Sequence, residues 1–103
     1  MSQVPSGLRV TPSEWHLIED ILSRHLASTR VLAFGSRATG KPKPYSDLDL
    51  AIVSEKPVPI DTLARLSEAF SESDLPWKVD VLDYSMTDES FQRIIQRDGI
   101  PLR

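Results

Sequence analysis

Three aspartates, Asp47, Asp49 and Asp80, have the residue type and spacing to bind a divalent cation. Asp47 and Asp49 are two residues apart in the segment 47–53, which alternates as a strand does, and side chains at that spacing leave a strand on one face. Two such carboxylates repel each other unless a cation lies between them, and Mg²⁺ takes carboxylates, water and substrate phosphate as ligands. Asp80 stands in the otherwise apolar stretch 79–82 of the strand predicted at 77–82, where an unpartnered carboxylate would be costly. If the two strands are neighbours, Asp80 becomes a third ligand.

A glycine and a serine follow the apolar run 30–34 and open a short segment that closes at Gly40. A strand that breaks at glycine and restarts as a helix exposes backbone N–H groups at the helix N-terminus, where the helix dipole also favours anions. The hydroxyl of Ser36 is a further donor, and Arg37 supplies a permanent positive charge. The pattern predicts that Gly35, Ser36 and Arg37 hold phosphate. Because Gly-Ser turns are common, this prediction depends on the carboxylates nearby.

The elements that must position these residues alternate along the chain. Thr11, Pro12 and Glu14 form a helix start with capping-box spacing. From hydrophobic periodicity we expect helices at about 12–28, just after Gly35, at 60–71 and at 88–97, with strands at 30–34, 47–53 and 77–82. This alternation predicts an α/β fold in which helices pack on a small sheet, while strand order and direction stay open. Residues 1–10 are predicted to form a flexible tail and 11–103 a single domain.

Composition excludes several classes of function. The chain has 12 basic and 15 acidic residues and a net charge of -3, so no overall basic surface favours a nucleic acid or an anionic membrane. It has no cysteine, which rules out disulfides and thiolate metal sites. No apolar run approaches the roughly 20 residues of a membrane span, and the first ten residues lack a signal-peptide core. We therefore expect a cytoplasmic protein that binds neither membrane nor nucleic acid directly.

A family resemblance is carried by three segments together: Gly-Ser-Arg-Ala-Thr-Gly at 35–40, Ser-Asp-Leu-Asp-Leu at 46–50 and Val-Asp-Val at 79–81. The combination resembles the nucleotidyltransferase superfamily of DNA polymerase beta. It is most similar to the minimal nucleotidyltransferases, or MNT proteins, and the likeness extends from the first helix to residues 98–102. The resemblance implies the polymerase beta-like fold, a small mixed sheet with helices packed on it.

The resemblance also implies roles for single residues. Gly35 and Ser36 would hold the terminal phosphates of a nucleoside triphosphate. Asp47 and Asp49 would bind two Mg²⁺ ions, and Asp80 would bind the ion nearest the attacking group and help to activate it. The implied reaction is attack of a hydroxyl on the α-phosphate, with pyrophosphate leaving and catalysis mostly by positioning and charge neutralisation.

The acceptor and the partner are implied only by the family. Larger members of the superfamily carry an appended domain that binds the acceptor, whereas about 20 residues follow Asp80 here. MNT proteins pair with a HEPN-domain protein, often a ribonuclease toxin, and act as its antitoxin. The resemblance therefore implies a hetero-oligomer in which AMP passes from ATP to a tyrosine of the toxin.

Two other hypotheses stay open. A non-catalytic binding module would neutralise its partner by covering it, and Thr39 favours this slightly because related proteins commonly carry Arg or Lys there. An enzyme acting on a small hydroxyl compound, like the antibiotic nucleotidyltransferases, is the third possibility. The sequence leaves open the roles of Lys41 and Lys43 in their proline-spaced loop, and it favours packing over base stacking for Trp77 and Tyr84.

Overall fold

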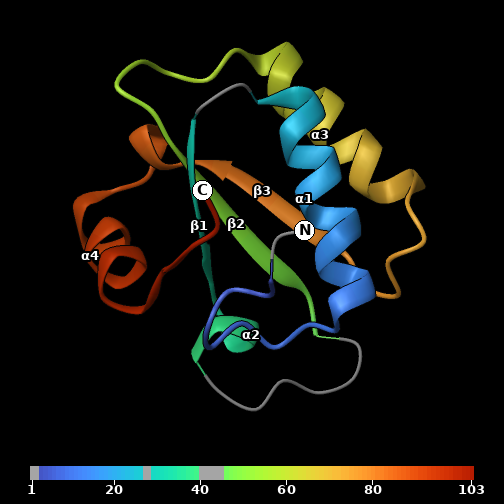
Figure 1. Cartoon of the computed structure of the whole chain (residues 1–103). Coiled ribbons are helices and arrows are strands. Elements are labelled where there is room, and N and C mark those ends of the chain that lie inside the picture. Colours follow the sequence, from blue (N-terminus) through green and yellow to red (C-terminus); the bar gives the residue numbers. More distant parts are fainter. Residues whose placement is uncertain (1–2, 27–28, 40–45) are drawn as a thin grey trace.

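The chain folds into a four-stranded mixed sheet with helices on both faces (Figure 1). The structure is a computed structural model, and it describes residues 3–26, 29–39 and 46–103. The elements follow in the order α1 (Pro12–His25), β1 (Arg30–Phe34), α2 (Ser36–Thr39), β2 (Leu48–Val53), α3 (Ile60–Glu72), β3 (Val79–Asp83), the 3₁₀ turn η1 (Tyr84–Met86), α4 (Glu89–Asp98) and β4 (Ile100–Pro101). The strand order is β3-β2-β1-β4, with β2 parallel to β3 and the other pairs antiparallel. This confirms the predicted fold class and supplies the strand order.

Helix α1 begins as the sequence predicts. The hydroxyl of Thr11 accepts the N–H of Glu14 at 3.1 Å, and the Glu14 carboxylate accepts the N–H of Thr11 at 2.9 Å, which completes a capping box. The helix ends at His25 and not near residue 28, because Leu26 adopts an extended conformation and is buried in the core. In the described part of the chain, no helix is both long and apolar enough to cross a bilayer.

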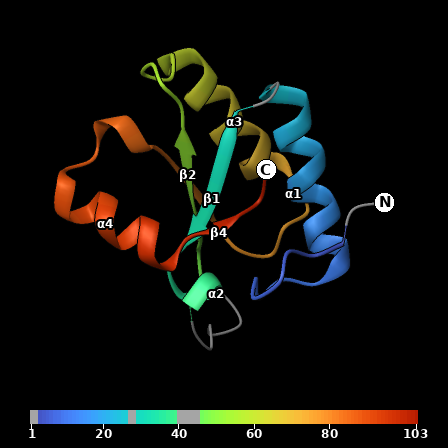
Figure 2. The same ribbon diagram turned by 60° about the vertical axis from the view of Figure 1, so that its left-hand side comes forward.

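The two faces of the sheet are covered differently. Helices α1 and α3 pack on one face, and α4 packs on the other (Figures 1 and 2). The first face contributes alternate residues of β2, namely Leu48, Leu50 and Ile52, to the larger core. The second face holds a smaller cluster of Leu32, Phe34, Ala51 and Ile95. Because side chains alternate along a strand, Asp49 lies on the same face as Ala51, the face that α4 covers.

The segment predicted to be a flexible tail packs partly against the domain. Residues 3–10 contain no helix or strand. Leu8 is nevertheless buried in the larger core, and the N–H of Arg9 donates to the carbonyl of Arg37 at 2.8 Å. Part of this segment therefore belongs to the packed unit.

The sequence pattern did not predict β4 and η1. Strand β4 pairs with the free edge of β1, and the N–H of Leu102 then donates to the carbonyl of Val31 at 2.8 Å. The turn η1 is capped by Asp83, whose carboxylate accepts the N–H and the hydroxyl of Ser85. The same carboxylate accepts the N–H of Val58 at 2.7 Å. Asp83 is therefore a cap residue at the end of β3.

Candidate active site

The strand register brings the predicted carboxylates to one end of the sheet. In the parallel pair of β2 and β3, Asp49 lies directly opposite Asp80, so both side chains leave the sheet on the face covered by α4. Asp47 is exposed and immediately precedes β2. This end of the sheet lies beside α2, at the bottom of Figure 1. The two strands are thus neighbours, which is the condition on which the prediction of Asp80 as a third ligand depended.

The local electrostatics favour a cation at this end of the sheet. Burial raises the pKa of Asp49 above its ordinary value, and the negative charges of Asp80 and then Asp47 raise it further. Asp49 is half-buried, and its register partner in β1 is Phe34, which packs edge-to-face against Phe91 of α4. A bound divalent cation would relieve both the desolvation and the repulsion.

The described side chains are not arranged as a complete set of metal ligands. Among the described residues, no group of three acidic or histidine side chains converges closely enough to hold a metal ion. Asp80 is instead paired with Lys78, whose Nζ lies 3.3 Å from its Oδ1. The donor set still fits a hard ion such as Mg²⁺, because every candidate ligand is a carboxylate. For the carboxylates to share an ion, they would have to lie closer together than they do here.

The Gly35 turn lies against Asp49. Gly35 has a φ of +80°, a conformation that L side chains rarely adopt. A Cβ added at this position would collide with Oδ2 of Asp49. The Gly35 carbonyl accepts the N–H and the hydroxyl of Thr39, and these bonds close the single turn of α2. Ser36 is exposed at the start of that turn, so two of the three residues predicted to hold phosphate, Gly35 and Ser36, lie in a turn beside Asp49.

Arg37 has contacts that differ from the predicted nucleotide contact. Its side chain is buried, with Nε donating to the carbonyl of Ser46 at 2.8 Å and Nη1 to that of Arg9 at 2.9 Å. The guanidinium also lies over the ring of Trp77, 4.3 Å from its centroid, and burial lowers the pKa of Arg37. Arg37 therefore joins three segments within the fold, and through Ser46 it fixes the backbone immediately before Asp47.

Other residues singled out in the sequence have clear positions or fall outside the described part. Trp77 is buried beneath Arg37, and Tyr84 packs against the smaller core cluster, so both expectations of packing are confirmed. Gly40, Lys41 and Lys43 lie outside the described residues.

Sequence reasoning missed one charged neighbour of the site. Lys78 precedes Asp80 by two residues, and the period of two along a strand was the available signal that both would lie on one face. The prediction treated Asp80 as lacking a positively charged partner in its own strand, and so overlooked Lys78 two residues before it.

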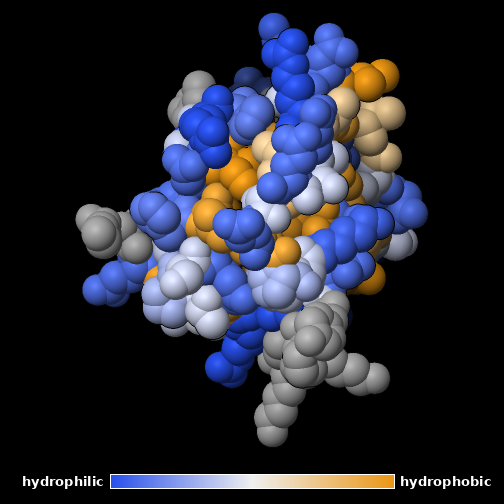
Figure 3. Space-filling model, turned by 90° about the vertical axis from the view of Figure 1, so that its right-hand side faces the viewer, coloured by the Kyte–Doolittle hydropathy of each residue, from blue (hydrophilic) through white to orange (hydrophobic). Residues whose placement is uncertain are grey.

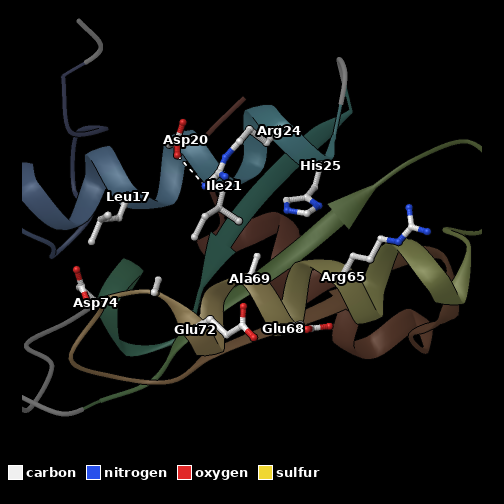
Figure 4. Close-up of a pocket in the computed structure, with 11 residues that line it drawn as sticks. Leu17, Asp20, Ile21, Arg24, His25, Arg65, Glu68, Ala69, Glu72 and Asp74 are labelled. Carbon is white, nitrogen blue, oxygen red and sulfur yellow. Dashed lines mark ion pairs between the residues drawn. The ribbon is translucent and has the colours of Figure 1, made fainter.

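The hollow nearest the carboxylates follows the free edge of β3. It measures about 530 Å³ and is lined by residues of α3 and by the segment 75–81, including Lys78 and Asp80. A second hollow of about 490 Å³ lies between α1 and α3, the helices that cover the opposite face of the sheet (Figure 4). Its walls carry both signs of charge, among them the ion pair of Asp20 and Arg24 at 2.9 Å. Seen from that side, apolar surface shows between hydrophilic side chains (Figure 3). Only the first hollow adjoins the candidate site.

Comparison with known proteins finds a family of nucleotidyltransferases and a relative named as an adenylyltransferase. The family described as polymerase beta, nucleotidyltransferase, matches residues 17–103 of this chain. A relative from Haemophilus influenzae, named as a probable protein adenylyltransferase, MntA, is 50% identical over 90 residues. That alignment covers 87% of this chain and 79% of the relative.

Solved structures share the fold. A toxin–antitoxin structure with AMP-PNP has a TM-score of 0.72 at 20% identity, covering 86% of this chain and 72% of that one. A toxin–antitoxin structure of MntA–HepT has a TM-score of 0.66 at 17% identity, covering 90% of this chain and 72% of that one. At these identities the likeness shows the fold alone. The family match and the relative with half its residues identical show more, namely that this chain belongs to the polymerase beta nucleotidyltransferase family.

Proposed function

We propose that this chain is a metal-dependent nucleotidyltransferase that transfers AMP from ATP to a tyrosine of a HEPN ribonuclease toxin and so acts as its antitoxin. The name of the MntA relative and the toxin–antitoxin neighbours support this assignment. The observation that carries it is the register of β2 and β3, which sets Asp49 opposite Asp80 beside the Gly35 turn. In this proposal the chain works in the cytoplasm, in a hetero-oligomer with its target, and binds ATP and no nucleic acid.

The reaction requires one bond to form as another breaks. The acceptor oxygen forms a bond to the α-phosphorus of ATP, the bond from that phosphorus to the bridging oxygen breaks, and pyrophosphate leaves. Asp47 and Asp49 would hold two Mg²⁺ ions, whose chemistry is to neutralise the phosphate charge and stabilise the leaving group. Asp80, on the edge strand β3 beside β2, would bind the ion nearest the acceptor hydroxyl and help to activate that hydroxyl by taking its proton.

The surroundings of the carboxylates leave separate places for the nucleotide and for the acceptor. Because Gly35 has no side chain, the backbone of the turn approaches the carboxylate of Asp49 closely, and phosphate bound at Ser36 would lie near the ions. The hollow along the edge of β3 offers space beside Asp80 for a segment that carries the acceptor. The nucleotide and the acceptor would therefore approach the carboxylates from different sides.

The proposal is tested by incubating the chain with labelled ATP, Mg²⁺ and the HEPN partner. We expect label on a tyrosine of the partner, and at least a hundredfold loss for the double variant Asp47→Asn, Asp49→Asn, since the ions would lose their shared ligands. Asp20→Asn removes an exposed carboxylate from α1 and is the control. Transfer that persists in the double variant would contradict the proposed chemistry.

The alternative of a non-catalytic binding module is favoured by one observation. Asp80 is paired with Lys78, and the described acidic side chains do not converge as metal ligands. The same double variant separates the two functions in cells that express the toxin. Full protection by a variant that transfers no label would support neutralisation by binding, whereas loss of protection supports adenylylation.

A further inference from the structure

We propose that Lys78 is an internal counter-ion of the site, whose ammonium occupies the carboxylate of Asp80 until a divalent cation displaces it. Lys78 would then set the cation concentration at which Asp80 becomes a metal ligand. This inference rests on the proposed function, because it takes Asp80 as a ligand of the acceptor-side ion. It adds a positioning residue that the family resemblance did not indicate.

The geometry of the ion pair between Lys78 and Asp80 would allow a divalent cation to replace the ammonium. Nζ of Lys78 lies 3.3 Å from Oδ1 of Asp80, and the two side chains are 72% and 47% exposed. No other ion pair among the described residues involves any of the three carboxylates. Such an exposed pair is weak and forms and breaks readily in water. Lys78 therefore pairs with Asp80, but the pair is weak enough for a divalent cation to replace the ammonium.

The ammonium of Lys78 should weaken the binding of a divalent cation to Asp80. The ammonium of Lys78 and a divalent cation bound to Asp80 share one negative charge, and the two positive charges repel each other across the few ångströms of the site. Removing the ammonium should therefore strengthen metal binding. Since exposed ion pairs contribute little, the expected gain is modest, about two- to fivefold in the dissociation constant.

The test is a calorimetric titration of Mn²⁺ into the full chain without nucleotide. We expect Lys78→Met to lower the dissociation constant about two- to fivefold, and Lys78→Arg, which keeps the charge, to stay close to the unmodified chain. Lys56→Met is the charge-matched control, because Lys56 is exposed in the turn beyond the other end of β2. Thermal unfolding of each variant shows whether the fold is intact. An unchanged or weakened affinity in a folded Lys78→Met variant would overturn the proposal.

A second substitution separates this inference from the proposed function. Asp80→Asn should weaken Mn²⁺ binding, and Lys78→Met added to it should then change nothing further, because the shared carboxylate is gone. If Asp80→Asn leaves the affinity unchanged, Asp80 is not a metal ligand and the proposed site itself fails. If Asp80→Asn weakens binding while Lys78→Met does not strengthen it, only the counter-ion role is refuted.

Discussion

Replacing Gly35 by alanine should damage both the fold and the site. Its φ of +80° costs a residue with a side chain about 1–2 kcal/mol, and moving the carboxylate of Asp49 from the new Cβ adds about 1 kcal/mol of side-chain strain. Each kcal/mol lowers the Tm of a domain of this size by about 4–8 °C. We therefore expect Gly35→Ala to lower the Tm by roughly 10–20 °C.

Gly7→Ala is the matched control. Gly7 has a φ of +87°, and a Cβ there would meet only Cδ1 of Ile100, at 3.3 Å, and none of the three carboxylates. The two variants share the backbone strain, but only Gly35→Ala displaces Asp49. Thermal unfolding by circular dichroism should show the larger loss for Gly35→Ala, and Mn²⁺ titration a weakened affinity for that variant alone. Equal losses of Tm with unchanged Mn²⁺ affinity would refute the contact with Asp49.

Three further substitutions address the charges around the site. Burial and like charges raise the pKa of Asp49, so this group favours the folded state most at acid pH and loses that contribution as pH rises through its raised pKa. At pH 7 without divalent ions, Asp49→Asn should therefore have a higher Tm than the unmodified chain. This difference in Tm should shrink as the pH falls toward 4. A difference that grows toward acid pH would contradict the raised pKa of Asp49. Arg37→Met leaves the carbonyls of Ser46 and Arg9 without their donor and should lower the free energy of unfolding by about 2–4 kcal/mol in urea. Asp83→Ala removes the acceptor of three hydrogen bonds and should cost about 2–4 kcal/mol while leaving Mn²⁺ affinity unchanged; a shift in that affinity would place Asp83 in the site.

The elements that the sequence predicted are those whose signals are local. The capping box of α1, the apolar run of β1 and the alternation of β2 each lie within a few residues, and all three elements form, although α1 ends at His25 and β2 begins at Leu48. Asp49 was assigned to the site because it stands two residues from Asp47 in a strand, and Asp80 because it interrupts an apolar strand. Local patterns of this kind are sufficient to place a side chain on a strand face but not to place strands beside one another.

The features that the sequence did not predict depend on contacts between distant segments. Arg37 was assigned to the nucleotide, yet its partners lie nine positions ahead in Ser46, 28 positions behind in Arg9, and across the fold in Trp77. Strand β4 is two residues long, includes a proline, and forms because β1 has a free edge for it. Neither can be read from a window of sequence, since each is decided by the tertiary arrangement.

The direction of β3 decides whether a site exists at all. Because β1 runs antiparallel to β2, the chain leaves β1 at Gly35 beside the N-terminal end of β2, where Asp49 lies. Asp80 is the second residue of β3, so a parallel β3 brings it to that same end, opposite Asp49. An antiparallel β3 would carry Asp80 toward the far end of β2, near Ile52, and away from the Gly35 turn. One parallel pairing within an otherwise antiparallel sheet is therefore what joins a phosphate turn and carboxylates from separate strands, and a cross-link between cysteines at positions 49 and 80 would form only in this arrangement.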